Sequence, residues 1–463
     1  MMTLHQALDW ITLAGLSATL VGDGSVTIIR VHTDTRSLQS GDLFVALKGE
    51  QFDANDFLSQ ARQQGAVAVV AHRGVAAAGL SGLEVRDSRL AMAALAQAWR
   101  AQFDIPLVAV TGSNGKTTVT QMIASIFKAW KHDDAFSTQG NLNNDIGVPL
   151  TLLRLRAHHQ LGVVELGMNH PGEIAFLGGM TRPTVALVNN AQREHLEFMG
   201  TVDAVARENG AVIASLDACG TAVFPANDEH SGMWRELAGS RNVLTFALAA
   251  PADICAQASW AGNGWEVLAL TPAGPIGFGL AIAGWHNVKN ALAATACALA
   301  AGVPADFIAK GLSAFVPVKG RSRAVLIESK GHSVTLIDDT YNANPDSMRA
   351  AIEVLASLAG PRLLVMGDMG EVGNQGPQFH DEAGRLAREL GVEKLFSLGV
   401  QSARATSSFR HGVHFEDMAA LNAAVLAELP GLGSVLVKGS RFMKMERVVQ
   451  AITDQEKQER ETT

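Results

Sequence analysis

Short apolar runs alternate with amphipathic stretches along most of this chain, and their spacing predicts an α/β protein. The clearest case is the apolar run Leu107–Val110, which is followed by the glycine-rich segment Thr111–Gly115 and by a helical pattern from about Lys116 to Trp130. A strand, a glycine-rich turn and a helix in this order open an α/β nucleotide-binding domain. Further strands of this sheet are predicted at Leu161–Glu165, Val185–Asn189 and Ala222–Pro225. Each run ends in polar residues, and ligands of an open parallel sheet bind at the carboxyl ends of its strands.

The alternation restarts in the last third of the chain. An alanine-rich helix is predicted over about Val288–Ala301, and a domain boundary near Pro317–Gly320. Beyond it the pattern predicts strands at Val334–Ile337, Arg362–Met366, Lys394–Leu398 and Ser434–Val437, and helices at Asp346–Leu358, Phe379–Leu390, Met418–Leu429 and Met443–Ile452. This spacing is typical of a second doubly wound sheet. The charged tail Asp454–Thr463 is predicted to be frayed or disordered.

The first hundred residues mix short apolar runs with two helical patterns. The predicted strands lie within Val26–Val31, Leu43–Leu47 and Ala66–Val70, and the predicted helices within Phe57–Gln64 and Arg89–Ala101. A chain of 463 residues is long enough for about three domains. We predict domains over residues 1–104, 105–318 and 319–463.

Composition and charge narrow the class of protein. The chain is 48% hydrophobic with a net charge of −8, so it can bury cores but lacks the basic charge of a non-specific nucleic-acid binder. Its three cysteines, Cys219, Cys255 and Cys297, lack the spacing of a zinc cluster or disulfide framework and suit a reducing compartment. The N-terminus lacks the basic residues of a secretory signal, and no apolar stretch reaches the roughly 20 residues of a membrane span. These features predict a soluble, cytoplasmic protein.

The strongest chemical signal is the segment from Thr111 to Thr118. Its glycines allow backbone N–H groups and the start of the following helix to face a phosphate. Lys116 would neutralise the β- and γ-phosphate oxygens, and the Thr117 hydroxyl would bind Mg²⁺. The longer form of this loop has a glycine where Val110 stands, so this is a shorter variety. The predicted phosphate-binding residues are Gly112, Ser113, Asn114, Gly115, Lys116, Thr117 and Thr118. The alternative is an ordinary strand-to-helix turn with an exposed lysine.

The short loop resembles that of the Mur ligases and the folylpolyglutamate synthetases, and nine other segments narrow the resemblance to the Mur ligases. In chain order they are Asp34–Ser37, Gly41–Gly49, Asn141–Pro149, Glu165–Ile174, His195–Glu197, Gly284–Asn290, Asp338–Ser347, Met366–Glu371 and Val437–Arg441. They fall in register along nearly the entire chain. Within the family, they look most like the branch that adds D-alanyl-D-alanine.

The resemblance implies a three-domain architecture and a reaction. The expected domains are an N-terminal one that holds the UDP end of the substrate, a central P-loop ATPase-like domain with a parallel sheet, and a C-terminal Rossmann-like lid. The expected reaction joins UDP-MurNAc-tripeptide to D-Ala-D-Ala through an acyl phosphate, with ATP and Mg²⁺, and yields ADP and phosphate. It implies a cytoplasmic, monomeric enzyme of peptidoglycan synthesis, and thus of cell shape and cell division.

The resemblance also implies catalytic residues. Lys116 and Thr117 would serve the phosphates, and Glu165, at the end of a buried strand, would bind Mg²⁺. A salt-bridged structural glutamate is the alternative. His195 matches the family's metal-site histidine, although a lone histidine can be structural. Arg321 matches a hinge arginine that reaches the γ-phosphate when the lid closes, and otherwise would be an exposed linker residue.

Five residues match the family's contacts with the rest of the nucleotide. Asn290 would contact adenine with help from Asn287, whose alternative role is capping of its helix. Asp339 would bind the ribose, and Tyr341 and Asn342 would pack near the nucleotide.

Five further residues match the family's contacts with the UDP-linked substrate. Thr35 and Arg36 resemble the pair that grips the UDP diphosphate. Asn141, Asn143 and Asn144 would donate to sugar and carboxylate oxygens, although asparagine-rich turns are also common without a ligand.

The sequence departs from the family at one position. Mur ligases usually carry, shortly after the metal-site histidine, a lysine that CO₂ converts to a carbamate ligand of a second Mg²⁺. Here that position holds Asn209, and the sequence has no lysine between Lys131 and Lys289. We hypothesise that Glu208, as a metal ligand, or Asn209 supplies the missing oxygen directly or through water.

Two other functions stay open. The Mur ligases that add diaminopimelate or lysine normally carry an Asp-Asn-Pro-Arg run, which this chain lacks. The other open function is that of a Mur-like nucleotide-binding protein without ligase chemistry. Only the absence of the carbamate-forming lysine favours it.

Overall fold

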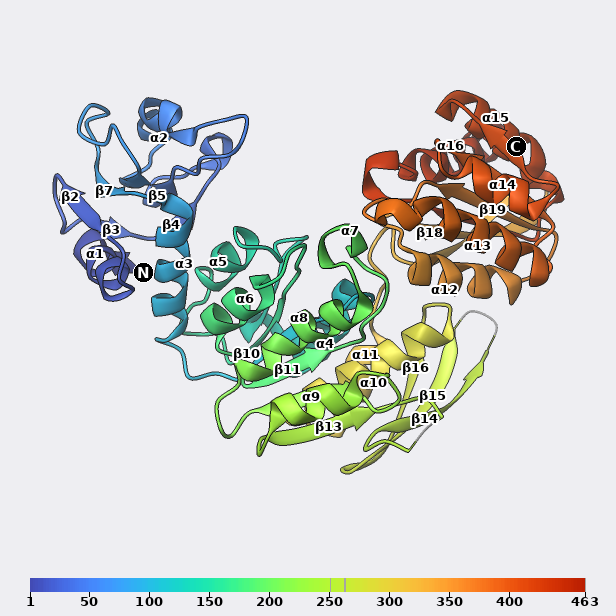
Figure 1. The fold of residues 1–463 in the computed structure, drawn as a ribbon, viewed down its shortest axis with the longest axis horizontal. Helices are drawn as coiled ribbons and strands as arrows, with labels where there is room; N and C mark the ends of the chain where they lie inside the picture. The colour runs from blue at the N-terminus through green and yellow to red at the C-terminus, as the bar shows by residue number, and fades with distance from the viewer. Residues whose placement is uncertain (250, 262–263, 463) are drawn as a thin grey trace.

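The computed structural model describes residues 1–249, 251–261 and 264–462. Three α/β regions follow one another along the molecule, with the first and last at opposite ends (Figure 1). Their main sheets lie within residues 18–85, 107–246 and 323–438. The predicted α/β class is confirmed, while the limits of the domains stay predictions.

The first region is built on a five-stranded sheet in the order β2-β7-β6-β5-β4. β2 pairs antiparallel with β7 and the other pairings are parallel. These strands are β2 Ala18–Val21, β4 Arg30–His32, β5 Asp42–Val45, β6 Ala68–Ala71 and β7 Ser81–Val85, beside a small pair of β1 Met2–Thr3 and β3 Thr27–Ile28. The helices are α1 Leu4–Leu13, α2 Leu58–Gln63 and α3 Ser88–Arg100. The elements predicted here are present with their ends shifted by a few residues, except that the predicted strand within Val26–Val31 is divided between β3 and β4, which belong to different sheets.

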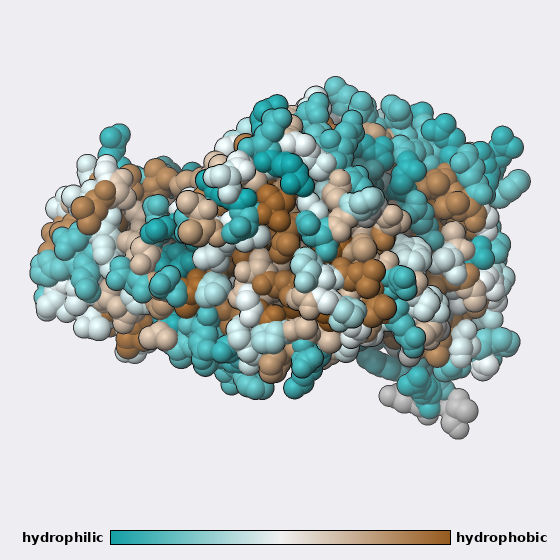
Figure 2. Space-filling model, turned by 90° about the horizontal axis from the view of Figure 1, so that it is seen from below, coloured by the Kyte–Doolittle hydropathy of each residue, from teal (hydrophilic) through white to brown (hydrophobic). Residues whose placement is uncertain are grey.

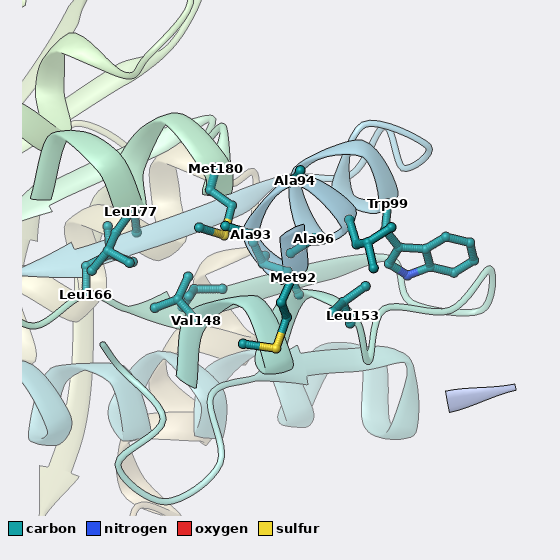
Figure 3. Close-up of a cluster of buried hydrophobic side chains, with 14 of the residues drawn as sticks. Met92, Ala93, Ala94, Ala96, Trp99, Val148, Leu153, Leu166, Leu177 and Met180 are labelled. Atoms are coloured by element: carbon teal, nitrogen blue, oxygen red, sulfur yellow. The ribbon is translucent and has the colours of Figure 1, made fainter. Parts of the chain in front are cut away.

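Helix α3 attaches the first region to the central one. Its buried side chains, among them Met92 and Trp99, share a continuous core with the central residues Val148, Leu166 and Met180 (Figure 3). This shared core fixes the first region to the central sheet.

The central region has a six-stranded, wholly parallel sheet in the order β13-β12-β11-β8-β10-β9. Its strands are β8 Leu107–Thr111, β9 Ala135–Ser137, β10 Leu161–Glu165, β11 Val185–Val188, β12 Thr221–Pro225 and β13 Asn242–Phe246. Its helices are α4 Lys116–Lys131, α5 Gly147–Leu152, α6 Glu173–Thr181, α7 Leu196–Met199, α8 Val202–Ala214, α9 Ser231–Ala238, α10 Trp285–Ala300 and α11 Ala305–Ser313. After β8 the chain forms β9 and β10 on one side of this strand, and then β11, β12 and β13 on its other side. The carboxyl end of β8 is therefore a topological switch point, where such sheets bind ligands.

A separate antiparallel sheet was not predicted. It consists of β14 Cys255–Trp260, β15 Trp265–Thr271 and β16 Gly274–Leu280. Burial alternates strictly along most of β15, the signature of a sheet with one solvated face. Seen from below, the molecule carries apolar patches among polar residues (Figure 2).

The C-terminal region has a six-stranded sheet in the order β17-β18-β22-β19-β20-β21, parallel except for β17 at one edge. Its strands are β17 Arg323–Ser329, β18 His332–Asp339, β19 Arg362–Gly367, β20 Lys394–Leu398, β21 Val413–Phe415 and β22 Ser434–Lys438. Its helices are α12 Pro345–Ala356, α13 Gly376–Glu389, α14 Ala403–Phe409, α15 Met418–Glu428 and α16 Glu446–Thr462. The predicted second doubly wound sheet is confirmed.

The prediction of a frayed tail is wrong, because α16 continues to Thr462. Its carboxylates accept hydrogen bonds from the hairpin of β17 and β18, from Glu328 N to Glu456 (3.1 Å) and from Lys330 N to Glu459 (3.1 Å). The charged residues of the tail thus bind the backbone of the edge strand. In the part of the chain that is described, no helix has the length and apolarity needed to cross a membrane.

Candidate active site

A cavity of about 460 Å³ lies at the carboxyl end of β8, between the central and C-terminal regions. Both regions line it. The predicted residues among its walls are Ser113, Asn114, Gly115, Lys116, Thr117, Thr118, Asn143, Asn144, Glu165, His195, Asn287, Asn290, Arg321, Asp339, Tyr341 and Asn342. Residues far apart in sequence therefore meet at one site, as predicted.

The glycine-rich loop and the first turn of α4 form the candidate phosphate site, which we call the cradle. The N–H groups of Gly112, Ser113 and Asn114 donate to Asn209 Oδ1, Asn190 O and Asn190 Oδ1, so the N–H groups that could bind an anion are those at the start of α4. Gly112 and Gly115 have φ of +128° and +82°, which favour glycine. A Cβ on Gly115 would lie 2.6 Å from Asn290 Oδ1 and 2.7 Å from Asn189 Nδ2. The loop leads directly into α4, whose first N–H groups and helix dipole favour an anion.

Lys116 lies folded over this loop. Its Nζ donates to Gly112 O (2.6 Å) and Ser113 O (3.2 Å) and pairs with Glu194 Oε1 at 2.7 Å. The ammonium is therefore at the mouth of the cradle, not exposed on a helix surface as the alternative reading required.

Glu165 closes β10 as a buried carboxylate with one unsatisfied oxygen. Its Oε1 accepts from Thr117 Oγ1 (3.1 Å) and Asn143 Nδ2 (2.7 Å), whereas Oε2 has no hydrogen-bond partner among the described residues. The residue is only 2% exposed, and an unpaired buried carboxylate oxygen is costly. Carboxylate and hydroxyl oxygens suit Mg²⁺, so this donor set fits the predicted metal.

The protein alone does not surround a metal. Among residues 1–249, 251–261 and 264–462, no cluster of three or more His, Cys, Asp or Glu side chains is placed to hold one. Phosphate oxygens would have to complete the coordination, which is the usual way that Mg²⁺ binds in nucleotide sites.

His195 connects the central region to the C-terminal region. Its Nδ1 lies 2.7 Å from Glu371 Oε2, without the geometry of a hydrogen bond, and its Nε2 lies 3.5 Å from Glu194 Oε1. Burial lowers the pKa of His195, but the two carboxylates outweigh it and raise that pKa to about 9. The imidazole is thus charged at neutral pH and would have to lose a proton before it could bind a metal.

The asparagines behind the loop form a chain of amide hydrogen bonds. Asn189 Nδ2 donates to Asn290 Oδ1 (2.9 Å), and Asn290 Nδ2 donates to Asn287 Oδ1 (3.0 Å). Asn287 Nδ2 in turn donates to Ala283 O (2.7 Å), just before α10. Asn287 therefore fixes the entry of its helix, which supports the structural alternative for this residue.

The C-terminal wall carries an ion pair that was not predicted. Lys438 Nζ lies 2.5 Å from Asp339 Oδ2 and 2.9 Å from Asn342 O. Burial raises the pKa of the Asp339 carboxyl, but Lys438 outweighs it and holds that pKa below its usual value. Beside this pair, the Arg321 guanidinium lies 4.1 Å from the centroid of the Tyr341 ring.

Three of the predicted substrate residues lie outside the cavity. Thr35 and Arg36 belong to a short turn of the first region, where exposed Arg36 pairs with Asp34 at 2.7 Å. Asn141 is exposed and is not among the cavity's lining residues. Asn144 lines the cavity, and its Oδ1 accepts from Gly147 N (2.9 Å) at the start of α5.

Glu208 does not reach the cavity, which argues against its predicted role as a metal ligand. Its two carboxylate oxygens accept from Gly172 N (2.8 Å) and Ile174 N (2.7 Å) at the start of α6. Asn209 is also engaged, because its Oδ1 accepts from Thr111 Oγ1 (2.6 Å) and Gly112 N (2.9 Å). Asn209 therefore supports the phosphate loop from behind.

The segment Gln192–Glu194 was missed, although it directly precedes the predicted His195. Gln192 accepts from Asn114 Nδ2 (2.7 Å), and Arg193 pairs with two carboxylates of the C-terminal region, Asp346 at 2.6 Å and Glu382 at 3.0 Å. This segment therefore joins the loop to the C-terminal region.

We expect Arg193→Ala to loosen the contact between these two regions. It would remove both ion pairs and leave two partly buried carboxylates, at a cost of about 2 kcal/mol. The nucleotide-free variant should have a larger radius of gyration in small-angle X-ray scattering. The matched control is Arg404→Ala, which removes an ion pair with Asp381 inside the C-terminal region. Equal radii for the wild type and Arg193→Ala would contradict this assignment.

Comparison with known proteins places the chain among enzymes. It matches three families: the Mur ligase family catalytic domain over residues 27–100, the Mur ligase middle domain over 110–298, and the Mur ligase glutamate ligase domain over 322–441. The UDP-N-acetylmuramoyl-tripeptide–D-alanyl-D-alanine ligase of Escherichia coli is 40% identical, with 96% of this chain and 98% of the relative covered. The same enzyme of Haemophilus influenzae is 38% identical, with 95% and 96% covered.

Solved structures agree with these sequence relatives. A crystal structure of MurF from Acinetobacter baumannii has a TM-score of 0.89 at 35% identity and covers 98% of both chains. MurF from Thermotoga maritima in complex with ADP has a TM-score of 0.83 at 27% identity, with 94% of this chain and 99% of that chain covered.

Proposed function

This chain belongs to the Mur ligase family, and we propose that it is the ATP-dependent ligase that joins D-alanyl-D-alanine to UDP-N-acetylmuramoyl-tripeptide for peptidoglycan synthesis. The observation that carries the proposal is the cavity at the carboxyl end of β8. It brings together Lys116, the Glu165 carboxylate with its unpartnered oxygen, and residues of the C-terminal region such as Asp339. Relatives with this activity at up to 40% identity over 96% of the chain support it.

The chemistry requires activation of a carboxylate, which is a poor electrophile. The tripeptide carboxylate would take the γ-phosphoryl group of ATP, and the amine of the dipeptide would then displace phosphate from the acyl phosphate. The N–H groups at the start of α4 and the Lys116 ammonium would hold the phosphates and neutralise charge as it develops.

Thr117, Glu165 and His195 are the residues that would hold Mg²⁺, which would supply further neutralisation of the phosphate oxygens. The fit rests on the Glu165 oxygen that has no partner and on the Thr117 hydroxyl beside it.

The remaining wall residues would bind the nucleoside end of ATP. Asn290 is the proposed adenine contact and Asp339 the proposed ribose contact, with Tyr341 and Asn342 beside them. Arg321, which now lies on the Tyr341 ring, would turn to the γ-phosphate.

The UDP end would be bound by Thr35 and Arg36 of the first region, and the sugar and peptide by Asn141, Asn143 and Asn144. We propose a monomeric, cytoplasmic enzyme. The cytoplasmic location is supported by the three free cysteines and by the need for ATP.

The test is phosphate release from ATP by the purified protein. We expect release only when UDP-MurNAc-tripeptide and D-Ala-D-Ala are both present, because each step consumes one of them. Turnover that needs neither substrate would contradict the proposal and support a nucleotide-binding protein of another function. Turnover with diaminopimelate or lysine as the amine donor would instead identify an amino-acid-adding ligase.

A further inference from the structure

The cavity contains a second buried carboxylate with a free oxygen, that of Glu194. Its side chain is only 10% exposed, and its Oε2 has no hydrogen-bond partner among the described residues. Its other oxygen, Oε1, pairs with Lys116 Nζ at 2.7 Å. A buried carboxylate oxygen without a donor is costly unless a ligand satisfies it.

The other acidic side chains that line this cavity have partners for their carboxylates. Asp339 pairs with Lys438, Asp346 with Arg193 and Asp145 with Arg89, and Glu173 accepts from two backbone N–H groups. Of the carboxylates on the described walls, only those of Glu165 and Glu194 have a buried oxygen without a partner.

These two carboxylates flank the first turn of α4. Thr117 Oγ1 donates to Glu165, whereas the preceding residue, Lys116, pairs with Glu194. Phosphates bound at the start of α4 would therefore lie near both carboxylates. His195, whose Nε2 lies 3.5 Å from Glu194 Oε1, adds an imidazole on the side of Glu194.

We propose that Glu194 is a ligand of a second divalent cation, together with His195 and the phosphates of ATP. In this chain it takes the place of the lysine carbamate, since Asn209 holds the phosphate loop and Glu208 caps α6. The site would then need no CO₂. This inference rests on the proposed function, which supplies the nucleotide.

Manganese binding tests the inference without turnover. With a non-hydrolysable ATP analogue bound, we expect the wild type to hold two Mn²⁺ ions per chain by electron paramagnetic resonance. Glu194→Gln keeps the size of the side chain but removes its charge, and should lose one ion or bind it at least about tenfold more weakly. Glu208→Gln is the matched control, because it makes the same chemical change on α8, outside the cavity. This variant should still bind both Mn²⁺ ions.

A second measurement addresses the carbamate. Wild-type turnover should be the same in CO₂-free buffer and with added bicarbonate. Bicarbonate-dependent activity would overturn the inference, as would a Glu194→Gln variant that holds both Mn²⁺ ions with wild-type affinity, because Glu194 would then serve only as the counter-ion of Lys116.

The Mn²⁺ measurement distinguishes an error in the proposed function from an error in the cation site. If the wild type bound two Mn²⁺ ions but formed no product from UDP-MurNAc-tripeptide and D-Ala-D-Ala, the assigned substrates would be wrong and the cation site would stand.

Discussion

Replacement of Lys116 by alanine should lower ligase turnover by about a thousandfold or more while leaving the affinity for UDP-MurNAc-tripeptide within a few-fold of the wild type. The ammonium lies at the mouth of the cradle, within 3.2 Å of two loop carbonyls. Negative charge moves onto phosphate oxygens as the γ-phosphoryl group is transferred, and a fixed cation there contributes most in the transition state. The proposed contacts with the tripeptide nucleotide are made by residues other than Lys116, among them Thr35 and Arg36 of the first region.

Steady-state phosphate release and calorimetric titration of the UDP-linked substrate measure the two effects separately. Lys310→Ala is the matched control, because Lys310 is exposed on α11 and does not line the cavity. The Lys116 variant also leaves Glu194 without its cation, so its thermal unfolding must be compared with the wild type. Equal losses of turnover and of substrate affinity would mean that the lysine assignment is wrong.

The sequence could predict the phosphate loop because all of its determinants are local. The positive φ of Gly112 and Gly115, the start of α4 and the place of Lys116 follow from eight consecutive residues. Glu165 could be predicted for a similar reason, since a polar residue that ends a buried apolar run marks the carboxyl edge of the sheet.

Residues whose role depends on a distant partner could not be predicted in this way. Arg193 acts through Asp346 and Glu382, which follow it by more than 150 positions. Glu208 and Asn209 are neighbours on α8, where one residue turns the side chain by about 100°. The sequence could not decide which of them faces the loop, and the structure gives that place to Asn209.

One of the two errors in the fold has the same cause, and the other follows from a weak strand signal. The tail after Asp454 is strongly charged, and its carboxylates find backbone N–H partners in the distant hairpin of β17 and β18. The strands β14 to β16 carry an alternating pattern, but glycine and proline in β16 weaken the strand signal in the sequence.

Glu165→Gln should separate the charge of this residue from its structural contacts. The amide oxygen of glutamine can still accept from Thr117 and Asn143, so the change removes the negative charge and puts an amide NH2 group in the place of Oε2. Because the buried carboxylate has an unsatisfied oxygen, the neutral amide costs less to bury in the metal-free protein. We therefore expect a melting temperature equal to or above that of the wild type. Site residues that are costly to the fold but required for activity commonly give this result.

Turnover of the same variant should fall by at least about a hundredfold, since the phosphate oxygens would lose a neutralising cation or its correct position. Excess Mg²⁺ should recover part of this loss, because weaker binding can be offset by concentration. Glu236→Gln, at an exposed position of α9, is the matched control for the chemical change. A variant that kept its turnover but lost stability would identify Glu165 as a structural residue of β10, because its charge would then serve to strengthen the hydrogen bonds from Thr117 and Asn143 and not to bind a metal.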